Sequence, residues 1–336
     1  MGAPAVPTRA VNMALSYPMR ESVILIGFVT MLSTAAPRLL RHARWPDRAP
    51  RVGIAVWLGL SGAAVAGMFA ASLAAALALP PVNHGVADLL RACLHLYHVD
   101  FDLAAPGTVI GAAGAVMVVA LPTWILARVI GVLRSAGRAR RRHLGMIALA
   151  AQPTDDGVLV LDHPRPALYC VPGPTSRIVL TSGAIRALDP AQLAAALAHE
   201  RGHLAGRHHL ITGLADGLAA ALPLPLLRGC RAAVRRLVEL AADDHVTRVH
   251  APAALAEAVV AVAAGPVPAG AFGAGDVAID RVTRLVHPPR RLGVCARVAA
   301  TVMVSLAFAV PIATGGLALT GAVATDPCGP TATAHT

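Results

Sequence analysis

One stretch of the chain, HERGHLAGRHH at residues 199–209, carries side chains whose types and spacing could bind a metal ion. His199 and His203 lie four residues apart, so a helix would present both imidazoles on one face, with Glu200 beside them. Neutral imidazoles bind catalytic zinc, which keeps one position open for water and lowers the pKa of that water to about 7. A neighbouring carboxylate can accept the proton of the water and deliver it to a leaving amine. The pattern therefore predicts a zinc hydrolase with Glu200 as the catalytic base.

The alternative is a helix on which these histidine and glutamate side chains are simply solvated. Glutamate is scarce in this chain, which has only Glu21, Glu200, Glu239 and Glu257. A glutamate at the required place between two histidines therefore rarely arises by chance, and the zinc site is the preferred interpretation.

His209 is one candidate for the third protein ligand, because the stretch also matches the longer pattern H-E-x-x-H-x-x-G-x-x-H. That arrangement needs a helix that ends at Gly206 and a methionine turn beneath the metal. After Met146, however, the next methionine is Met303, inside a long apolar segment. We therefore do not expect His209 to bind the metal. A helix that continued past Gly206 would turn His209 away from the ligand face, whereas a break at Gly206 could swing it back onto the metal.

Glu239 is the other candidate, in the stretch RRLVELAADDHV at residues 235–246. Glu239 and Asp243 share one face of a predicted helix, so one carboxylate could bind zinc while the other orients a liganding imidazole. A solvated helix face beside neighbouring arginines is the alternative for Glu239. Because glutamate is so scarce, we prefer Glu239 to His209 as the third ligand.

A strongly marked helix start positions the first motif. Asp189 is a predicted N-cap, Pro190 takes the first helical position and Gln192 closes a capping box, so the helix should run to about Gly206. Three short apolar runs precede it, separated by proline and glycine, and we expect them to be strands. They are residues 157–161, 167–171 and 177–180.

The composition is that of a membrane protein: of 336 residues, 56% are hydrophobic and 14% are charged, and the mean hydropathy is +0.63. Four apolar segments are expected to span a bilayer, whose core needs about 20 residues. They are residues 22–36, 52–79, 107–127 and 298–325. The apolar stretch 214–227 contains Asp216 and two prolines, and we expect a helix packed on the domain or on the membrane surface rather than a fifth span.

All 29 basic residues are arginine, and they set the expected orientation in the membrane. They concentrate between the first two spans and directly after the third, so the positive-inside rule places these segments, and residues 134–297, in the cytoplasm. Both termini are then external, and Cys93 and Cys328 are the two outward-facing cysteines that could form a disulfide. The net charge of +11 thus reflects topology and contact with the lipid bilayer. With 3% aromatic residues there are few stacking platforms, and we expect no direct nucleic-acid partner.

The sequence therefore predicts an α-helical membrane protein of the cell membrane, with four transmembrane helices and a cytoplasmic α+β domain. Residues 1–136 form the N-terminal membrane region with three spans, residues 137–296 form the cytoplasmic domain, and residues 297–336 form the fourth span and a short external tail. The sequence specifies no oligomeric state.

The HExxH motif at 199–203, followed by ELxxD at 239–243, resembles the BlaR/MecR-type integral-membrane zinc metallopeptidases, and the related HtpX-type gluzincins share both motifs. The lead-in PGPTSRIVLTSGAIRALDPAQLAAALAHE at 172–200 is also similar to these families, in which a strand before the helix lies along the active-site cleft. The resemblance implies a zincin-like (gluzincin) protease fold. It further implies the following roles: His199, His203 and Glu239 as ligands of Zn²⁺, Glu200 as catalytic base, Asp243 as a supporting acid, and His287, in an HP element of the HtpX type, as a candidate for oxyanion stabilisation.

The function that the resemblance implies is a membrane-embedded zinc endopeptidase that cleaves a cytoplasmic protein, such as a BlaI-like transcriptional repressor, in signal transduction. BlaR-type sensors continue after the last span into an extracellular penicillin-binding domain, which we do not expect here. One alternative is a quality-control protease of the HtpX type, although those enzymes place spans near residues 214–227. Another is a non-catalytic membrane signalling scaffold with a structural zinc site.

Overall fold

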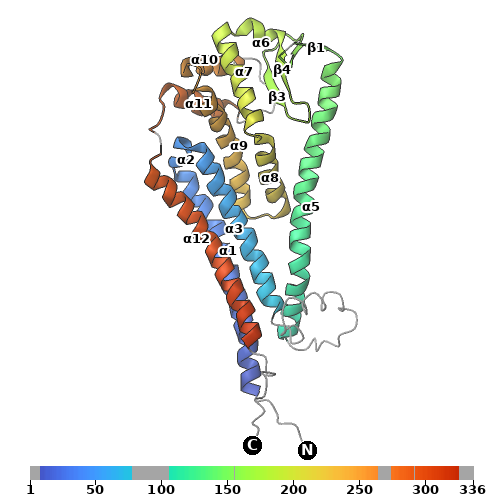
Figure 1. The fold of residues 1–336 in the computed structure, drawn as a ribbon, viewed down its shortest axis with the longest axis vertical. Coiled ribbons are helices and arrows are strands. Elements are labelled where there is room, and N and C mark those ends of the chain that lie inside the picture. Colours follow the sequence, from blue (N-terminus) through green and yellow to red (C-terminus); the bar gives the residue numbers. More distant parts are fainter. Residues whose placement is uncertain (1–7, 78–105, 155, 264–273, 291, 325–336) are drawn as a thin grey trace, which may run out of the picture. The chain divides into compact units, whose positions relative to one another are not determined.

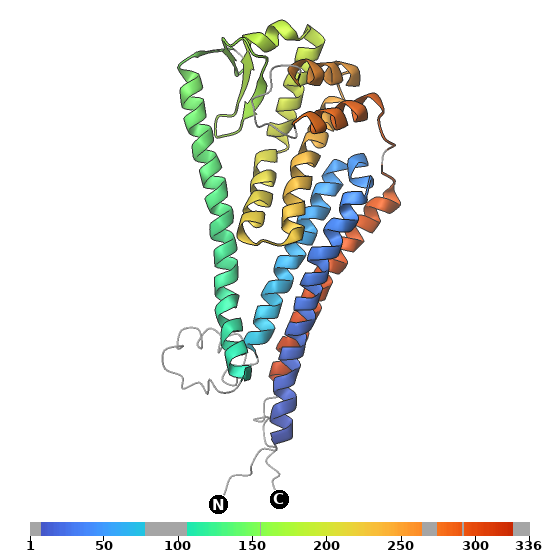
Figure 2. The ribbon, with the colours of Figure 1, turned by 180° about the vertical axis from the view of Figure 1, so that it is seen from behind.

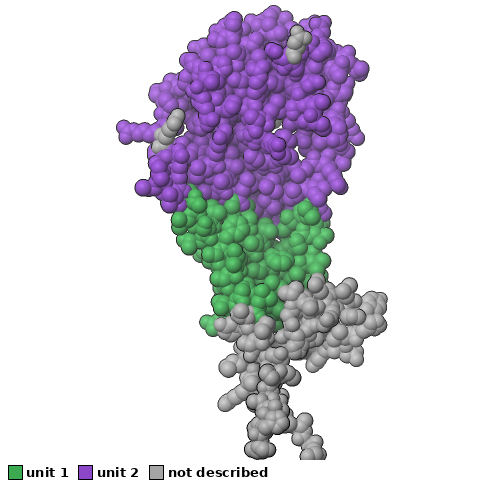
Figure 3. Space-filling view, viewed as in Figure 1, with its two compact units in different colours: residues 1–39, 59–126, 299–336 green, residues 40–58, 127–298 purple. Residues whose placement is uncertain are grey.

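The computed structural model describes residues 8–77, 106–154, 156–263, 274–290 and 292–324. The chain divides into two compact units (Figure 3). The first unit comprises the described residues up to 39, those of 59–126 and those from 299 onwards, and the second comprises those of 40–58 and 127–298. Cys93 and Cys328 lie outside the described residues.

Four long helices carry the apolar segments (Figures 1 and 2). They are α1 (Thr8–His42), α3 (Pro50–Ala76), α5 (Pro106–Ala148) and α12 (Val294–Ala324). Each contains a stretch long and apolar enough to cross a membrane, with a mean hydropathy between 1.8 and 2.2. The four expected spans are thus confirmed as apolar helices, while the domain boundaries drawn from the sequence stay a prediction.

Small residues allow the apolar helices of the first unit to pack closely. A Cβ added at Gly59 on α3 would lie 2.6 Å from Val304 on α12. A Cβ at Gly114 on α5 would lie 2.6 Å from the backbone nitrogen of Ala76 on α3. Close backbone approach at glycine is the usual means of helix packing within a membrane, where apolar burial supplies no driving force.

The second unit contains a four-stranded sheet. Its strands are β1 (Ala151–Pro153), β2 (Val158–Leu161), β3 (Leu168–Val171) and β4 (Arg177–Thr181), in the order β1-β2-β4-β3. Strands β2 and β4 are parallel and the other two pairings are antiparallel. The three predicted strands are confirmed, and β3 is an edge strand of this sheet.

Helices complete the second unit: α2 (Trp45–Arg48), α6 (Ser182–Ala187), α7 (Pro190–Ala205), α8 (His208–Ala221), α9 (Pro225–Val246), α10 (Pro252–Ala263) and α11 (Ala274–Val286). The capping box that starts α7 is confirmed, because Asp189 accepts from the backbone nitrogen of Gln192 and the Gln192 side chain accepts from that of Asp189. Helix α7 packs against α9, α10 and β3. A cluster of buried apolar side chains, including Ala195, Val246 and Leu255, joins α7, α9 and α10.

The expectation of one helix over residues 214–227 is wrong. Helix α8 ends at Ala221 and α9 begins at Pro225. The two prolines explain the break, since Pro223 offers no N–H to continue α8 and Pro225 suits the first turn of a new helix. Helix α8 is not among the candidate spans of the described residues, and the expectation that this stretch does not cross the membrane stays a prediction.

Candidate metal centre

Helices α7 and α9 bring three potential metal ligands together. The Nε2 atoms of His199 and His203 lie 3.0 Å apart. Glu239 on α9 places one carboxylate oxygen 3.4 Å from Nε2 of His199 and the other 3.5 Å from Nε2 of His203. Among the described residues these three form a group whose ligand atoms all lie within 4.8 Å of one another.

The spacing of these atoms fits a zinc ion. With zinc–ligand distances of about 2.0–2.1 Å and tetrahedral angles, neighbouring ligand atoms lie about 3.3 Å apart. The observed separations of 3.0, 3.4 and 3.5 Å agree with that value. Two imidazoles and one carboxylate also form a ligand set of catalytic rather than structural zinc sites, because they leave a fourth position for water. Binding of zinc by these residues stays a prediction, and the described geometry supports it.

Asp243 contacts His199 at Nδ1, the ring nitrogen opposite the potential metal-binding atom Nε2. Its Oδ1 lies 3.0 Å from Nδ1 of His199, and its side chain is 1% exposed. Burial alone would raise the pKa of Asp243, but hydrogen bonds from His199 and Arg281 hold that pKa below its ordinary value. Asp243 is therefore an ionised acceptor that can fix the orientation of the His199 ring and leave Nε2 free for a metal.

His199 is protonated in the metal-free protein. Burial lowers its pKa, but hydrogen bonds to Asp243 and Glu239 raise it by more, so the pKa is about 9. The same contacts act on Glu239: burial raises its pKa, and the hydrogen bonds from His199 and His203 bring it well below its ordinary value. Without a metal the cluster thus holds a cationic imidazole against two carboxylates.

Arg281, on α11, was not identified from the sequence. Its guanidinium donates to both carboxylate oxygens of Asp243, at 2.7 and 3.0 Å, and lies 3.3 Å from Glu239. The side chain is 14% exposed, so these are largely buried charge pairs. No motif spacing marks this residue, and its one sequence signal is that it lies on an amphipathic segment.

Glu200 faces β3 across the candidate site. Its Oε2 accepts a hydrogen bond of 2.9 Å from the backbone N–H of Cys170. Burial first, and then the charge of Glu200, raises the pKa of the Cys170 thiol to about 12, so this thiol stays protonated and is no nucleophile. The lead-in at 172–200 contains β4, which lies inside the sheet and so cannot be the strand expected along the cleft. The edge strand β3, which precedes the lead-in, contacts Glu200 instead.

A cavity of about 460 Å³ adjoins the three potential ligands and Glu200. Its other walls come from β3, α7, α10 and α11. Most of these side chains are apolar, and Arg281 is the charged exception: Leu168, Tyr169, Cys170, Ala196, Leu255, Ala258, Val259, Val262, Ala263, Ala278 and Arg281. The cavity therefore offers an aliphatic surface directly beside the potential metal ligands and Glu200.

The expected end of the helix near Gly206 is confirmed, and a helix that continues past Gly206 to turn His209 away is not what the structure shows. Helix α7 ends at Ala205, Arg207 adopts a left-handed conformation with φ 48°, and α8 starts at His208. The new direction brings His208, not His209, to the site, with its Nδ1 2.9 Å from Nδ1 of His203. Burial first, and then the charge of His203, lowers the pKa of His208 to about 4. His209 is not part of the ligand group, and its Nδ1 is buried without a hydrogen-bond partner among the described residues.

His287 is not brought to the site. It follows α11, is exposed, and does not line the cavity, while its backbone N–H donates to Thr283. The suggested role of His287 in oxyanion stabilisation stays a prediction that this position does not support.

Comparison with known families places a domain on this region. The profile described as Peptidase family M48 matches residues 134–268, which include α7, α9 and the whole ligand group. The match supports a zinc metallopeptidase of the broad HtpX/BlaR type and favours neither branch. Arg281 and His287 lie beyond the matched residues. Searches of curated proteins and of solved structures give no match.

Proposed function

We propose that this protein is a membrane-embedded zinc endopeptidase, of the HExxH plus ExxxD gluzincin kind, that cleaves protein substrates on the cytoplasmic side of the cell membrane. One observation carries the proposal: His199, His203 and Glu239 converge at the spacing of zinc ligands, with Glu200 lining the same cavity. The family match over residues 134–268 supports a peptidase, and the four apolar helices support a membrane location.

A substrate peptide would bind in extended form beside β3. Because β3 is an edge strand, its outer backbone groups can pair with an added strand. The backbone N–H of Cys170, which now donates to Glu200, lies on that outer side and could instead hold a substrate carbonyl. An endopeptidase needs such backbone pairing on both sides of the cleaved bond, because it must align a chain rather than a terminus.

The proton transfers would depend on Glu200. When bound, zinc would polarise the substrate carbonyl and lower the pKa of water at the open position. Glu200 would accept a proton from the attacking water and later deliver it to the leaving amine as the peptide bond breaks. Asp243 keeps the Nδ1–H of His199 engaged, so Nε2 stays available, and Arg281 offsets the negative charge of Asp243 and Glu239.

The cavity predicts which residues the enzyme prefers near the cleaved bond. Its α10 wall presents Leu255, Val259 and Val262, with no charged side chain among the lining residues of that helix. Burying an aliphatic side chain against such a wall contributes about 1.5–3 kcal/mol, whereas an ionised side chain would lose hydration without a partner. We therefore propose cleavage beside large apolar residues.

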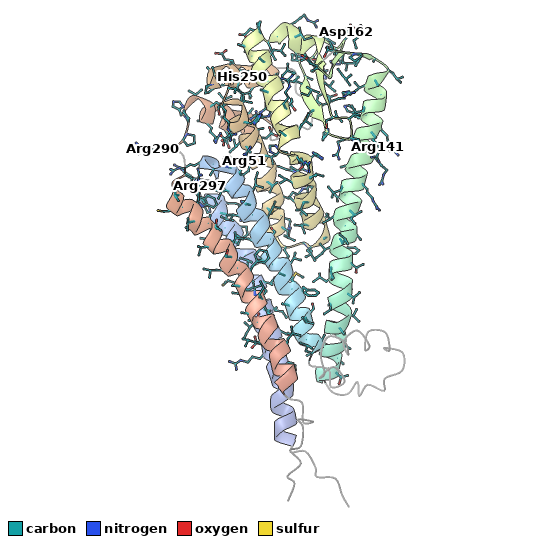
Figure 4. The ribbon with its side chains drawn as sticks, viewed as in Figure 1. Arg51, Arg141, Asp162, His250, Arg290 and Arg297 are labelled. Carbon is teal, nitrogen blue, oxygen red and sulfur yellow. The ribbon has the colours of Figure 1, made fainter. Side chains whose placement is uncertain are left out.

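The arginine distribution supports a cytoplasmic site. Arg51 on α3 and Arg141 on α5, both labelled in Figure 4, represent the two arginine-rich segments. Both belong to the unit that contains the ligand group. On the positive-inside rule, we propose that this unit lies in the cytoplasm. A reporter fused after Arg142 should behave as cytoplasmic, and one fused at Thr336 as exported. A cytoplasmic reporter at Thr336 would contradict four spans.

A proteolysis assay tests the proposed activity. Purified full-length protein in detergent should cleave casein, lose activity on treatment with a zinc chelator, and regain it when zinc is restored. Cleavage that is insensitive to chelation would refute a zinc mechanism. A protein that binds zinc but cleaves nothing would favour the signalling scaffold.

The substrate class can be identified in cells. The family match identifies no substrate, and the two that we propose to test are a BlaI-like repressor and misfolded membrane proteins. New N-terminal peptides would be compared between cells that carry the unchanged chain and cells that carry Glu200→Gln. A single cleaved repressor would indicate a signalling protease, and many cleaved membrane proteins would indicate quality control.

A further inference from the structure

His208 contacts His203 at the ring nitrogen that does not face the other two potential ligands. The Nδ1 atoms of the two rings lie 2.9 Å apart, and the rings meet edge to face, with centroids 4.9 Å apart and planes at 87°. His208 is 7% exposed, so this contact is shielded from water. Neither the longer sequence pattern nor the family resemblance pointed to this residue.

The protons of this contact follow from the geometry. Nε2 of His203 faces His199 and Glu239, so Nε2 is the atom that would bind a metal. A neutral imidazole that binds through Nε2 carries its proton on Nδ1. Two nitrogens at 2.9 Å need one donor and one acceptor. Nδ1 of His203 therefore donates, and Nδ1 of His208 accepts.

The backbone at Gly206 and Arg207 places the His208 ring beside His203. The left-handed backbone at Arg207 ends α7 and lets α8 begin at His208. A Cβ at Gly206 would collide with Nε2 of His208 and would lie 2.6 Å from its Cδ2. The missing side chain of Gly206 thus leaves the space that the ring occupies. This space for the His208 ring accounts for a glycine at position 206 better than the longer pattern does, in which the glycine would bring His209 to the metal.

We propose that His208 is a positioning residue that holds His203 in the tautomer and orientation needed to bind zinc. This inference rests on the zinc site of the proposed function. Each imidazole ligand then has its own hydrogen-bond acceptor at Nδ1: the carboxylate of Asp243 for His199, and the neutral ring of His208 for His203. Loss of such a supporting partner typically weakens metal binding by about 10- to 100-fold.

Zinc affinity of the purified full-length protein tests this role, measured by competition with a chelator. His208→Leu removes the acceptor but keeps an apolar side chain of similar bulk, and should weaken zinc binding by about 10- to 100-fold. His208→Asn can place an oxygen near the position of Nδ1 and should restore most of that loss. His209→Leu is the matched control on the neighbouring residue and should leave zinc affinity unchanged.

Two further measurements separate positioning from folding. The visible spectrum of the cobalt-substituted protein reports the geometry of the ligands, and should change in His208→Leu but not in His209→Leu. Gly206→Ala should weaken zinc binding through the displaced His208 ring, and should add little when combined with His208→Leu. If His208→Leu does not fold, His208→Ala takes its place in the same comparison.

Three results would overturn the inference. They are unchanged zinc affinity in His208→Leu, a loss in His208→Asn as large as that in His208→Leu, and an equal loss in His209→Leu. Failure of the proposed function looks different, because then the unchanged chain itself would bind no zinc, or would bind zinc and cleave nothing.

Discussion

Replacement of Arg281 by methionine should destabilise the protein far more without zinc than with it. Arg281 donates to both oxygens of Asp243 and lies 3.3 Å from Glu239, so Arg281→Met leaves two carboxylates with the His199 imidazolium as their one remaining cationic partner in the cluster. The Asp243 side chain is 1% exposed and cannot recover hydration. Removing one partner of a buried charge pair costs about 3–5 kcal/mol. This is the expected loss of unfolding free energy in the metal-free protein.

Bound zinc should reduce that loss, because the ion compensates the charge of Glu239 directly. Only Asp243 then lacks the hydrogen bonds that Arg281 donates in the unchanged protein. One buried acceptor that lacks a hydrogen bond costs about 1–3 kcal/mol. At roughly 2–4 °C per kcal/mol for a domain of this size, the metal-free variant should melt about 6–20 °C below the unchanged protein, and the zinc-bound variant should show a smaller deficit.

Thermal melting with and without a zinc chelator measures both values. Arg235→Met is the matched control, because Arg235 pairs with Asp216 at the surface and is 55% exposed. A surface pair contributes about 0–1 kcal/mol, so this variant should melt near the unchanged protein in both states. An Arg281→Met deficit as small as that of the control, or one that is the same with and without zinc, would refute the reasoning.

The remaining predictions concern zinc binding. The zinc affinity of Glu239→Ala should fall by more than the roughly 10- to 100-fold expected for Asp243→Ala, because the first change removes a ligand and the second removes the hydrogen-bond partner of a ligand. Stoichiometric zinc in purified Glu239→Ala would contradict this order. His209→Ala should keep its zinc, and metal analysis showing loss would restore the longer pattern. The pKa of His199 is raised from about 6.5 to about 9 by its carboxylate partners, so its protonated form stabilises the metal-free fold fully below pH 6.5, and this contribution is lost as the pH rises through 9. Zinc must displace that proton, so zinc binding should strengthen from pH 7 to pH 9 and should release protons. Calorimetry in buffers of different ionisation enthalpy measures this release. If no proton is released, the assigned charge of His199 is contradicted.

The sequence was most informative where local chemistry decides the structure. Asp189, Pro190 and Gln192 mark the start of α7 because capping depends on a few neighbouring residues. That start fixes the helical register, and so places His199 and His203 on one face. The three strands were found for a similar reason, since proline and glycine bound each apolar run.

Features that depend on tertiary contacts were missed. Strand β1 has three residues and ends in a proline, so it has no pattern of its own. Arg281 reaches Asp243 from a helix 38 residues further along the chain, and no spacing rule links the two residues. His208 was overlooked because a left-handed conformation at Arg207 is uncommon for any residue other than glycine, and the longer pattern drew attention to His209.

The most direct test of the central claim compares the unchanged full-length protein with Glu200→Gln, for zinc content and for casein cleavage in the same preparations. The substitution keeps the shape of the side chain and its ability to accept the N–H of Cys170, but it removes the base. We predict one zinc per chain in both proteins, and cleavage that falls by about 10²- to 10⁴-fold in the variant. Full cleavage by Glu200→Gln, or the absence of zinc from the unchanged protein, would contradict a zinc peptidase in which Glu200 is the base.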